Sequence, residues 1–279
     1  MKVLQRPNKL IIFFVLLFIP NLVFANSYSS IHYTIQSLFK VEIPTIKVTA
    51  EIKGKLSDQL IIDLPYKWAG VQYVDQIYNI KVLESNCKFT VNKKENHQLI
   101  ITIPKEIYSI KISYEIHQKA GNPSDVHETI IRKDLIHSPG YGLFAIPDDI
   151  KHTDKIQLSV EWETVPRNWS TISSHGYTNV LKFVGSRYQL LHALYSAGKL
   201  RSYQIGDKNA QVFLSLYGTF DIPDNIISSS MTEIIRTQRA FFNDSDFPYY
   251  TISLIEGDDP NSMGGTDYII VLQLIYLKV

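Results

Sequence analysis

The sequence predicts a mainly β protein with a smaller α+β part, in which an N-terminal antiparallel β-sandwich precedes a region of strands and one helix. Three observations predict this class. Apolar residues recur at every second position in many segments between residues 46 and 162, turn residues separate those segments, and a clear helical spacing of apolar residues occurs only near residue 231. A period of two gives each strand one apolar and one polar face. The composition, 45% hydrophobic and 20% charged, is that of an ordinary globular protein.

The strands of the first region alternate most regularly in two segments. Residues 110–116 place isoleucine or tyrosine at every second position. Residues 156–162 alternate in the same way, with isoleucine, leucine, valine and tryptophan at every second position. Shorter alternations occur at 46–52, 77–83 and 99–103. Because turn-forming residues separate these segments, we predict an antiparallel sandwich that ends near residue 165. The turns are predicted at Pro65, Gly121–Pro123, Ser138–Gly140 and Pro147–Asp149.

After residue 165 the pattern mixes strands with a helix. We predict strands at 181–184, 211–217 and 249–255, and a helix over 231–242. Ser230 and Glu233 fit a capping box at the start of this helix, and it is expected to end before Asn243, with Pro248 enforcing the exit. Its apolar face is predicted from Met231, Ile234, Ile235, Phe241 and Phe242. We therefore divide the chain into residues 1–25, 26–165 and 166–279.

The first 25 residues have the pattern of a secretory signal peptide. Lys2, Arg6 and Lys9 precede the apolar run 10–19, and Ala25 is a small residue of the kind that signal peptidase accepts. We expect cleavage before residue 26 and an exported protein, periplasmic or secreted. The apolar run is about half the length of a membrane-spanning helix, so a stable membrane anchor after cleavage is not expected, although an uncleaved anchor is the alternative.

Charge and cysteine content exclude some classes of function. The formal net charge is +1 and the sequence pI is about 7.8, so nucleic acid is not an expected partner. The single cysteine, Cys87, cannot form an internal disulfide and is interpreted as a small buried apolar residue rather than a nucleophile. The sequence contains no G-x-S-x-G elbow, G-x-G-x-x-G or P-loop, so serine catalysis and nucleotide cofactors are unsupported.

Two other patterns are weak candidates for a site. His127-Glu128 begins like the zinc motif H-E-x-x-H, but Ile131 stands where the second histidine belongs, so we expect no zinc site there. Trp68, Trp162 and Trp169 suggest either a carbohydrate-stacking platform or strand and core aromatics, and the core is favoured. We therefore assign no catalytic, cofactor-binding or metal-ligating residue from these patterns.

A series of short motifs runs from Trp162 to Thr266. They are Trp162-Glu163 with Pro166-Arg167-Asn168-Trp169, Ser173-Ser174-His175-Gly176, the octapeptide 191–198, the heptapeptide 236–242, the pentapeptide 246–250 and Gly264-Gly265-Thr266. In order and spacing they resemble the glycyl aminopeptidase family of zinc metallopeptidases. The resemblance implies an N-terminal β domain followed by a thermolysin-like (gluzincin) catalytic domain, which opens with a small sheet whose edge strand lies beside the substrate.

On this resemblance, the helix near residue 231 and the strand from Tyr249 belong to the opening of the peptidase domain. Gly264, Gly265 and Thr266 are the candidate remnant of its substrate-binding strand. A peptide is the expected partner, and zinc is the cofactor expected in intact relatives.

The sequence departs from the family at its C-terminal end. The helix that carries H-E-x-x-H and the downstream glutamate ligand follow the glycine-rich segment by more than the 13 residues left after Thr266. We therefore expect no cofactor in this chain and no peptidase activity. The apolar tail 268–279 is either a buried strand of a complete sheet or the product of a changed or terminated reading frame with an unpaired edge. The alternatives are a peptide- or glycan-binding sandwich without an enzymatic role, and an enzyme whose partner chain supplies the zinc helix.

Overall fold

The computed structural model describes residues 28–38, 42–56, 58–93, 95, 97–119, 127–205, 211–243, 249–256, 264–268 and 271–276. Its largest sheet has six strands in the order β15-β13-β1-β2-β9-β6. Their bounds are β1 (Tyr28–Leu38), β2 (Thr45–Leu56), β6 (Ile77–Val82), β9 (Ile107–His117), β13 (Ile156–Glu163) and β15 (Val180–Gly185). All neighbours are antiparallel except β1 and β13, which pair in parallel.

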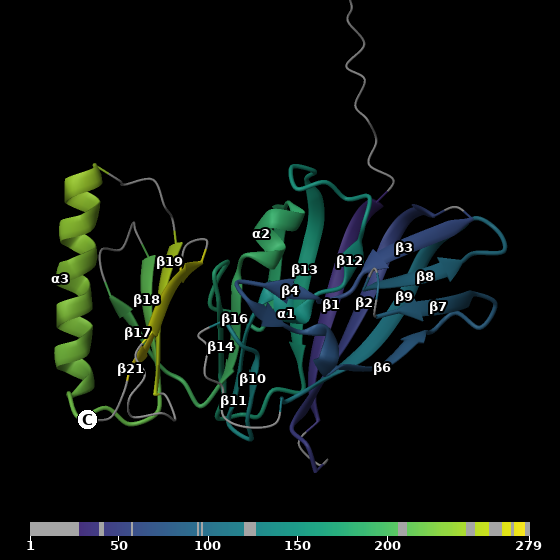
Figure 1. The fold of residues 1–279 in the computed structure, drawn as a ribbon. Coiled ribbons are helices and arrows are strands. Elements are labelled where there is room, and N and C mark those ends of the chain that lie inside the picture. The colour runs from purple at the N-terminus through teal and green to yellow at the C-terminus, as the bar shows by residue number, and fades with distance from the viewer. Residues whose placement is uncertain are drawn as a thin grey trace, which may run out of the picture.

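A second sheet packs against the first and completes the sandwich (Figure 1). Its strands lie in the order β12-β3-β8-β7, with bounds β3 (Gln59–Asp63), β7 (Lys88–Asn92), β8 (Gln98–Thr102) and β12 (Ile146–Pro147). Alternate residues of both sheets are fully buried in one core, among them Ile31, Val48, Ile62, Leu99 and Ile112. Burying each such side chain stabilises the fold by about 1.5–3 kcal/mol, so this core is the main source of stability.

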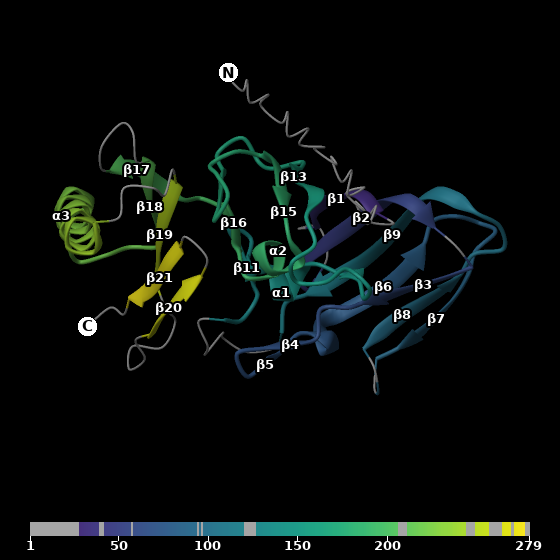
Figure 2. The same cartoon turned by 90° about the horizontal axis from the view of Figure 1, so that it is seen from above.

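Small elements lie beside the sandwich and carry the site described below. Four short strands form a sheet in the order β10-β11-β16-β14. Their bounds are β10 (Ile130–Ile131), β11 (Leu135–Pro139), β14 (Ser170–Ser173) and β16 (Leu194–Gly198). The helices α1 (Gly140–Leu143) and α2 (Arg187–Leu191), the hairpin β4 (Lys67–Trp68) and β5 (Val71–Gln72), and the 3-10 turn η1 (Val74–Gln76) complete the region (Figure 2).

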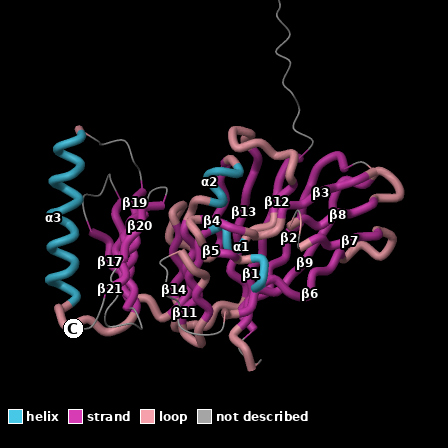
Figure 3. Tube along the Cα trace, in the orientation of Figure 1, coloured by secondary structure: helices cyan, strands magenta, loops and turns pink. Residues whose placement is uncertain are grey.

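The C-terminal part is a five-stranded sheet covered on one face by a long helix (Figure 3). The strand order is β17-β18-β19-β21-β20. The bounds are β17 (Arg201–Ile205), β18 (Gln211–Tyr217), α3 (Asp224–Phe242), β19 (Tyr249–Glu256), β20 (Gly264–Tyr268) and β21 (Val271–Tyr276). The Tyr217 hydroxyl, which donates to Asp134 Oδ1 (2.9 Å), and the Thr251 hydroxyl, which donates to Ser173 O (3.4 Å), join this sheet to the preceding region.

The mainly β class with a smaller α+β part is confirmed, as are the strands predicted from alternation. The segments 46–52, 110–116 and 156–162 fall in β2, β9 and β13, and the segments 77–83 and 99–103 extend one residue beyond the ends of β6 and β8. The later segments 181–184, 211–217 and 249–255 fall in β15, β18 and β19.

The predicted start of the long helix is wrong. The helix α3 begins at Asp224 after Pro223, so Ser230 lies inside the helix and is not its N-cap. Proline at the cap fixes the chain direction, and Asp224 in the first turn pairs with Arg201 (2.7 Å). Within these turns the Ser229 hydroxyl donates to the Ile226 carbonyl (3.0 Å).

The predicted apolar face of α3 is correct only in part. Ile227 and Ile235 are buried, and Met231 packs against them. Ile234 is 43% exposed, and Phe241 and Phe242 are 81% and 73% exposed. The helix ends at Phe242 as predicted, with Asn243 in the left-handed conformation (φ 48°) that commonly terminates helices.

The chain continues in the first sheet beyond residue 165. The predicted boundary lies between β13 and β15, which are hydrogen-bonded neighbours. The division into 26–165 and 166–279 stays a prediction. The signal peptide 1–25, the turn at Gly121–Pro123 and Pro248 lie outside the described residues.

Part of the apolar tail forms an interior strand. Residues 271–276 are β21, which pairs with β19 on one side and β20 on the other. The changed or terminated reading frame stays a prediction. Cys87 packs against the sandwich core, and burial raises the pKa of its thiol. No helix among the described residues is long and apolar enough to cross a membrane.

Candidate functional site

Trp68 lies at the centre of a group of aromatic and histidine rings, which we call the Trp68 cluster (Trp68, His127, Tyr141 and His192). The rings of Trp68 and Tyr141 stack, with centroids 5.3 Å apart and planes at 6°. His127 and His192 present their edges to Trp68 at 4.9 and 5.7 Å. The Tyr141 hydroxyl is 2.9 Å from His192 Nε2. The cluster joins the β4–β5 hairpin to α1 and to the end of α2.

The contact between Tyr141 and His192 in the Trp68 cluster carries little charge near neutral pH. Burial, and then the charge of His152, lower the pKa of His192. Burial also raises the pKa of Tyr141. A neutral imidazole against a protonated phenol forms a hydrogen bond without net charge, so this surface is suited to stacking on an apolar or planar group.

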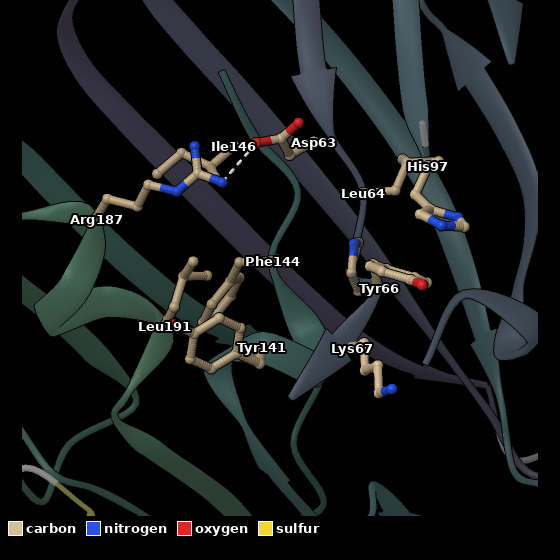
Figure 4. Close-up of a pocket in the computed structure, with 11 residues that line it drawn as sticks. Asp63, Leu64, Tyr66, Lys67, His97, Tyr141, Phe144, Ile146, Arg187 and Leu191 are labelled. Carbon is tan, nitrogen blue, oxygen red and sulfur yellow. Dashed lines mark hydrogen bonds and ion pairs between the residues drawn. The ribbon is translucent and has the colours of Figure 1, made fainter. Parts of the chain in front are cut away.

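A pocket of about 270 Å³ adjoins the cluster, and Tyr141 belongs to both (Figure 4). We call it the Asp63 pocket. It lies between the end of β3, the start of β4, the α1–β12 segment and α2. Its lining residues are Asp63, Leu64, Pro65, Tyr66, Lys67, His97, Tyr141, Phe144, Ile146, Arg187 and Leu191.

An ion pair spans one end of the Asp63 pocket. Arg187 Nη2 donates to Asp63 Oδ2 at 2.5 Å, and Arg187 Nη1 donates to the Pro147 carbonyl at 3.3 Å. Gln98 Nε2 donates to the other oxygen of Asp63 at 3.1 Å. The side chain of Arg187 is only 15% exposed. At the other end the rings of Tyr66 and His97 stack with centroids 3.4 Å apart.

Local sequence explains how these walls form. Ser186 and Gln189 make a capping box, so α2 begins at Arg187 and its side chain leaves the first turn of the helix. A β-carbon at Gly140 would overlap the Leu190 carbonyl, so only glycine lets α1 approach α2 this closely. The Tyr114 hydroxyl donates to Leu143 O (2.6 Å) and accepts from the Ala145 N–H (2.9 Å), which fixes Phe144 between them.

The structure places Gly264, Gly265 and Thr266 on β20, an edge strand of the C-terminal sheet. Their role as a substrate-strand remnant stays a prediction. Figure 2 shows β20 and the β4–β5 hairpin on the same side of the molecule.

His127 and Glu128 point to different partners. His127 contacts Trp68, and Glu128 pairs with Lys119 (3.2 Å). Within the described ranges no group of three or more histidine, cysteine, aspartate or glutamate side chains is arranged to hold a metal ion.

The three tryptophans do not form a common platform. Trp162 is 5% exposed in the sandwich core, and Trp169 packs against that core, as the favoured interpretation predicted. Trp68 alone of the three belongs to the cluster. Sequence reasoning missed the Asp63 pocket because its walls come from residues 63–67, 97, 141–146 and 187–191, and the only signal near it was the density of tyrosines and Trp68.

Comparison with solved structures identifies the architecture. An aminopeptidase N family protein from Idiomarina loihiensis superposes with a TM-score of 0.69 at 14% sequence identity, over 88% of this chain and 42% of that chain. The chain has the fold of the N-terminal part of M1 peptidases. An M1 zinc metallopeptidase from Deinococcus radiodurans aligns over 88% of this chain and 59% of its own, at 12% identity and a TM-score of 0.48. No protein-family model and no curated protein matches the sequence.

The chain thus spans less than half of the first matched structure. The fold agrees with the expected β domain followed by the opening of a peptidase domain. The cofactor, partner and export expectations stay predictions.

Proposed function

We propose that this chain is an exported protein that uses the N-terminal part of an M1-type peptidase fold to bind peptide, without cleaving it. The structural match, which covers 88% of the chain, supports the fold on which the proposal rests. Residues 1–25 act as the cleaved export signal in this proposal, and the mature protein is periplasmic or secreted.

The proposed lack of catalysis rests on the sequence. H-E-x-x-H supplies two zinc ligands and the general base of such peptidases, and the one His-Glu pair, at residues 127–128, has Ile131 in place of the second histidine. In this proposal zinc is a cofactor of the related peptidases, and the residues of this chain do not bind it.

The proposed peptide contact is the outer edge of β20, which pairs with no further strand among the residues that the structure describes. An extended peptide can add to a sheet edge through main-chain hydrogen bonds, and the glycines at 264 and 265 leave room for its backbone.

Two measurements on the purified mature chain test this proposal. Zinc content by mass spectrometry and hydrolysis of glycyl- and alanyl-coumarin amides, with and without added zinc or chelator, test catalysis. We expect no stoichiometric zinc and no chelator-sensitive hydrolysis. Stoichiometric zinc with hydrolysis would contradict the proposal, and activity only in the presence of a second chain would favour a zinc helix supplied by a partner.

Fluorescence anisotropy with a labelled alanine-rich pentapeptide tests binding. The matched control is the same peptide methylated at alternate backbone nitrogens, which removes main-chain donors and keeps the side chains. We expect the methylated peptide to bind at least about tenfold more weakly, since each lost hydrogen bond costs about 0.5–1.5 kcal/mol. Equal binding of the two peptides argues against edge-strand pairing.

A glycan- or peptide-binding sandwich module is the second candidate. The stacked Trp68 and Tyr141 rings beside a pocket favour it, because aromatic faces bind the apolar faces of sugars and of planar side chains. A glycan array with the intact protein and with Trp68→Ala distinguishes it: glycan binding that is lost in Trp68→Ala supports this candidate over the peptidase-like scaffold.

A further inference from the structure

The Asp63 pocket combines an apolar floor with a net positive charge. Leu64, Phe144, Ile146 and Leu191 supply apolar surface. The charged lining residues are Asp63 against Lys67 and Arg187, so the positive charges are in excess by one. A small cavity with these properties is suited to a ligand that has one negative charge and one apolar group.

Arg187 is held in position before any ligand arrives. Its bonds to Asp63 and to the Pro147 carbonyl use two of the five N–H donors of a guanidinium. The positive charge of Arg187 is therefore largely balanced by Asp63 at that end of the pocket. Asp63 is also committed, because Arg187 and Gln98 each donate to one of its oxygens.

Lys67 supplies the second positive charge. It is exposed on β4, on the opposite side of the pocket from Arg187 (Figure 4), and it forms no ion pair with the residues that the structure describes. Negative charge gathers at the Asp63 end, where burial and then the charges of Asp63 and Asp149 raise the pKa of Asp148. An anionic group is therefore repelled from that end and attracted toward Lys67 at the other side of the pocket.

We propose that the Asp63 pocket binds the α-carboxylate of a single apolar amino-acid residue, with its side chain on the floor formed by Phe144 and Leu191 and beside Tyr141. The volume of about 270 Å³ is at the lower end of ligand pockets, which span roughly 300–1,000 Å³, so it accommodates one residue and not an extended peptide. The site is separate from β20 and does not depend on the proposed function, because it involves neither zinc nor strand pairing.

Isothermal titration of the intact chain with N-acetyl-L-phenylalanine tests this proposal, with N-acetyl-L-phenylalaninamide as the uncharged, nearly isosteric control. We expect the acid to bind at least about tenfold more tightly than the amide, as for a charge-assisted hydrogen bond of about 1.5–3 kcal/mol. A tripeptide, N-acetyl-Gly-Gly-Phe, separates the two sources of this carboxylate. If it binds like the acid, the pocket receives a peptide C-terminus, and if only the short acid binds, the pocket receives a free amino-acid derivative.

Variants locate the binding. Lys67→Gln changes an exposed side chain. It is expected to weaken the binding of the acid about three- to tenfold and to leave the affinity for the amide unchanged. Lys88→Gln, on β7, is the matched control and is expected to have no effect. Equal affinity for acid and amide, no saturable binding of the acid, or equal effects of Lys67→Gln and Lys88→Gln would overturn the proposal.

Discussion

The Tyr114 hydroxyl ties the sandwich core to the wall of the Asp63 pocket, and its removal is a sharp test of how that wall is held. Tyr114 is fully buried in β9. Its hydroxyl donates to Leu143 O at 2.6 Å and accepts from the Ala145 N–H at 2.9 Å. These two backbone groups flank Phe144, which lines the pocket. Tyr114→Phe keeps the ring and removes both bonds.

The expected magnitude follows from the groups left unpaired. A buried backbone group without a partner costs about 1–3 kcal/mol, so two such groups predict a loss of about 2–4 kcal/mol in the free energy of unfolding, with some relaxation of the loop. Tyr33→Phe removes one bond, to Ala145 O (2.9 Å), and predicts a loss of about 1–2 kcal/mol. Tyr108→Phe is the surface control: Tyr108 is 69% exposed, and we expect a change below about 0.5 kcal/mol.

Urea unfolding followed by circular dichroism measures the three variants under identical conditions. The expected order of destabilisation is Tyr114→Phe, then Tyr33→Phe, then Tyr108→Phe. If Tyr114→Phe is no less stable than Tyr108→Phe, the hydroxyl does not hold the α1–β12 segment. A folded Tyr114→Phe protein should also bind N-acetyl-L-phenylalanine more weakly, because Phe144 is no longer fixed.

Two further predictions concern α3 and α1. The Arg201 guanidinium donates a hydrogen bond to Asp224 and holds the pKa of that carboxyl below its usual value. The pair therefore contributes its full stability above the unfolded pKa of about 3.9. This contribution is lost as the pH falls through the lower pKa of the folded state. Urea unfolding of the native chain and Asp224→Asn should therefore differ at pH 5–7 and converge in more acidic solution, and a constant difference would exclude this linkage. Gly140→Ala places a β-carbon against the Leu190 carbonyl and the Leu191 Cα, and these backbone atoms cannot swing away. Calorimetry should therefore show a loss of about 1–3 kcal/mol in the free energy of unfolding. An unchanged melting temperature would mean that α1 and α2 are free to separate.

Strands were predictable because their burial is one-sided. In β13, Ile156, Leu158 and Val160 face the core while Gln157 is exposed, and this alternation is visible in the sequence. Which strands pair was not predictable, because the alternation of apolar and polar residues is the same in parallel and in antiparallel strands. The parallel pairing of β1 with β13 joins residues more than a hundred positions apart, and no local pattern encodes it.

The start of α3 shows where local rules conflict. Ser230 and Glu233 satisfy the capping-box pattern, but a cap is needed only where the backbone N–H groups have no partner in a preceding turn. Pro223 and Asp224 supply the start two turns earlier, and Asp224 gains a tertiary bond to Arg201 that the sequence pattern does not display. The exposed Phe241 and Phe242 lie beyond the end of the core that Ile227 and Ile235 fill.

Two of the motifs that carry the family resemblance, at 173–176 and 191–198, are explained by packing in the small sheet. Ser174 N–H donates to Leu194 O (3.0 Å), and Leu194 N–H donates to the Ser174 hydroxyl (2.9 Å), so the motif at 173–176 and the motif at 191–198 hold each other in place. His175 stacks on Phe183 at 4.1 Å, and burial lowers its pKa, which favours a neutral structural ring. Because these residues are needed to build β14 and β16, their similarity to the peptidase family speaks for a shared fold. The similarity of these motifs gives no information on zinc chemistry, because zinc is bound by other residues. Zinc binding must be tested separately.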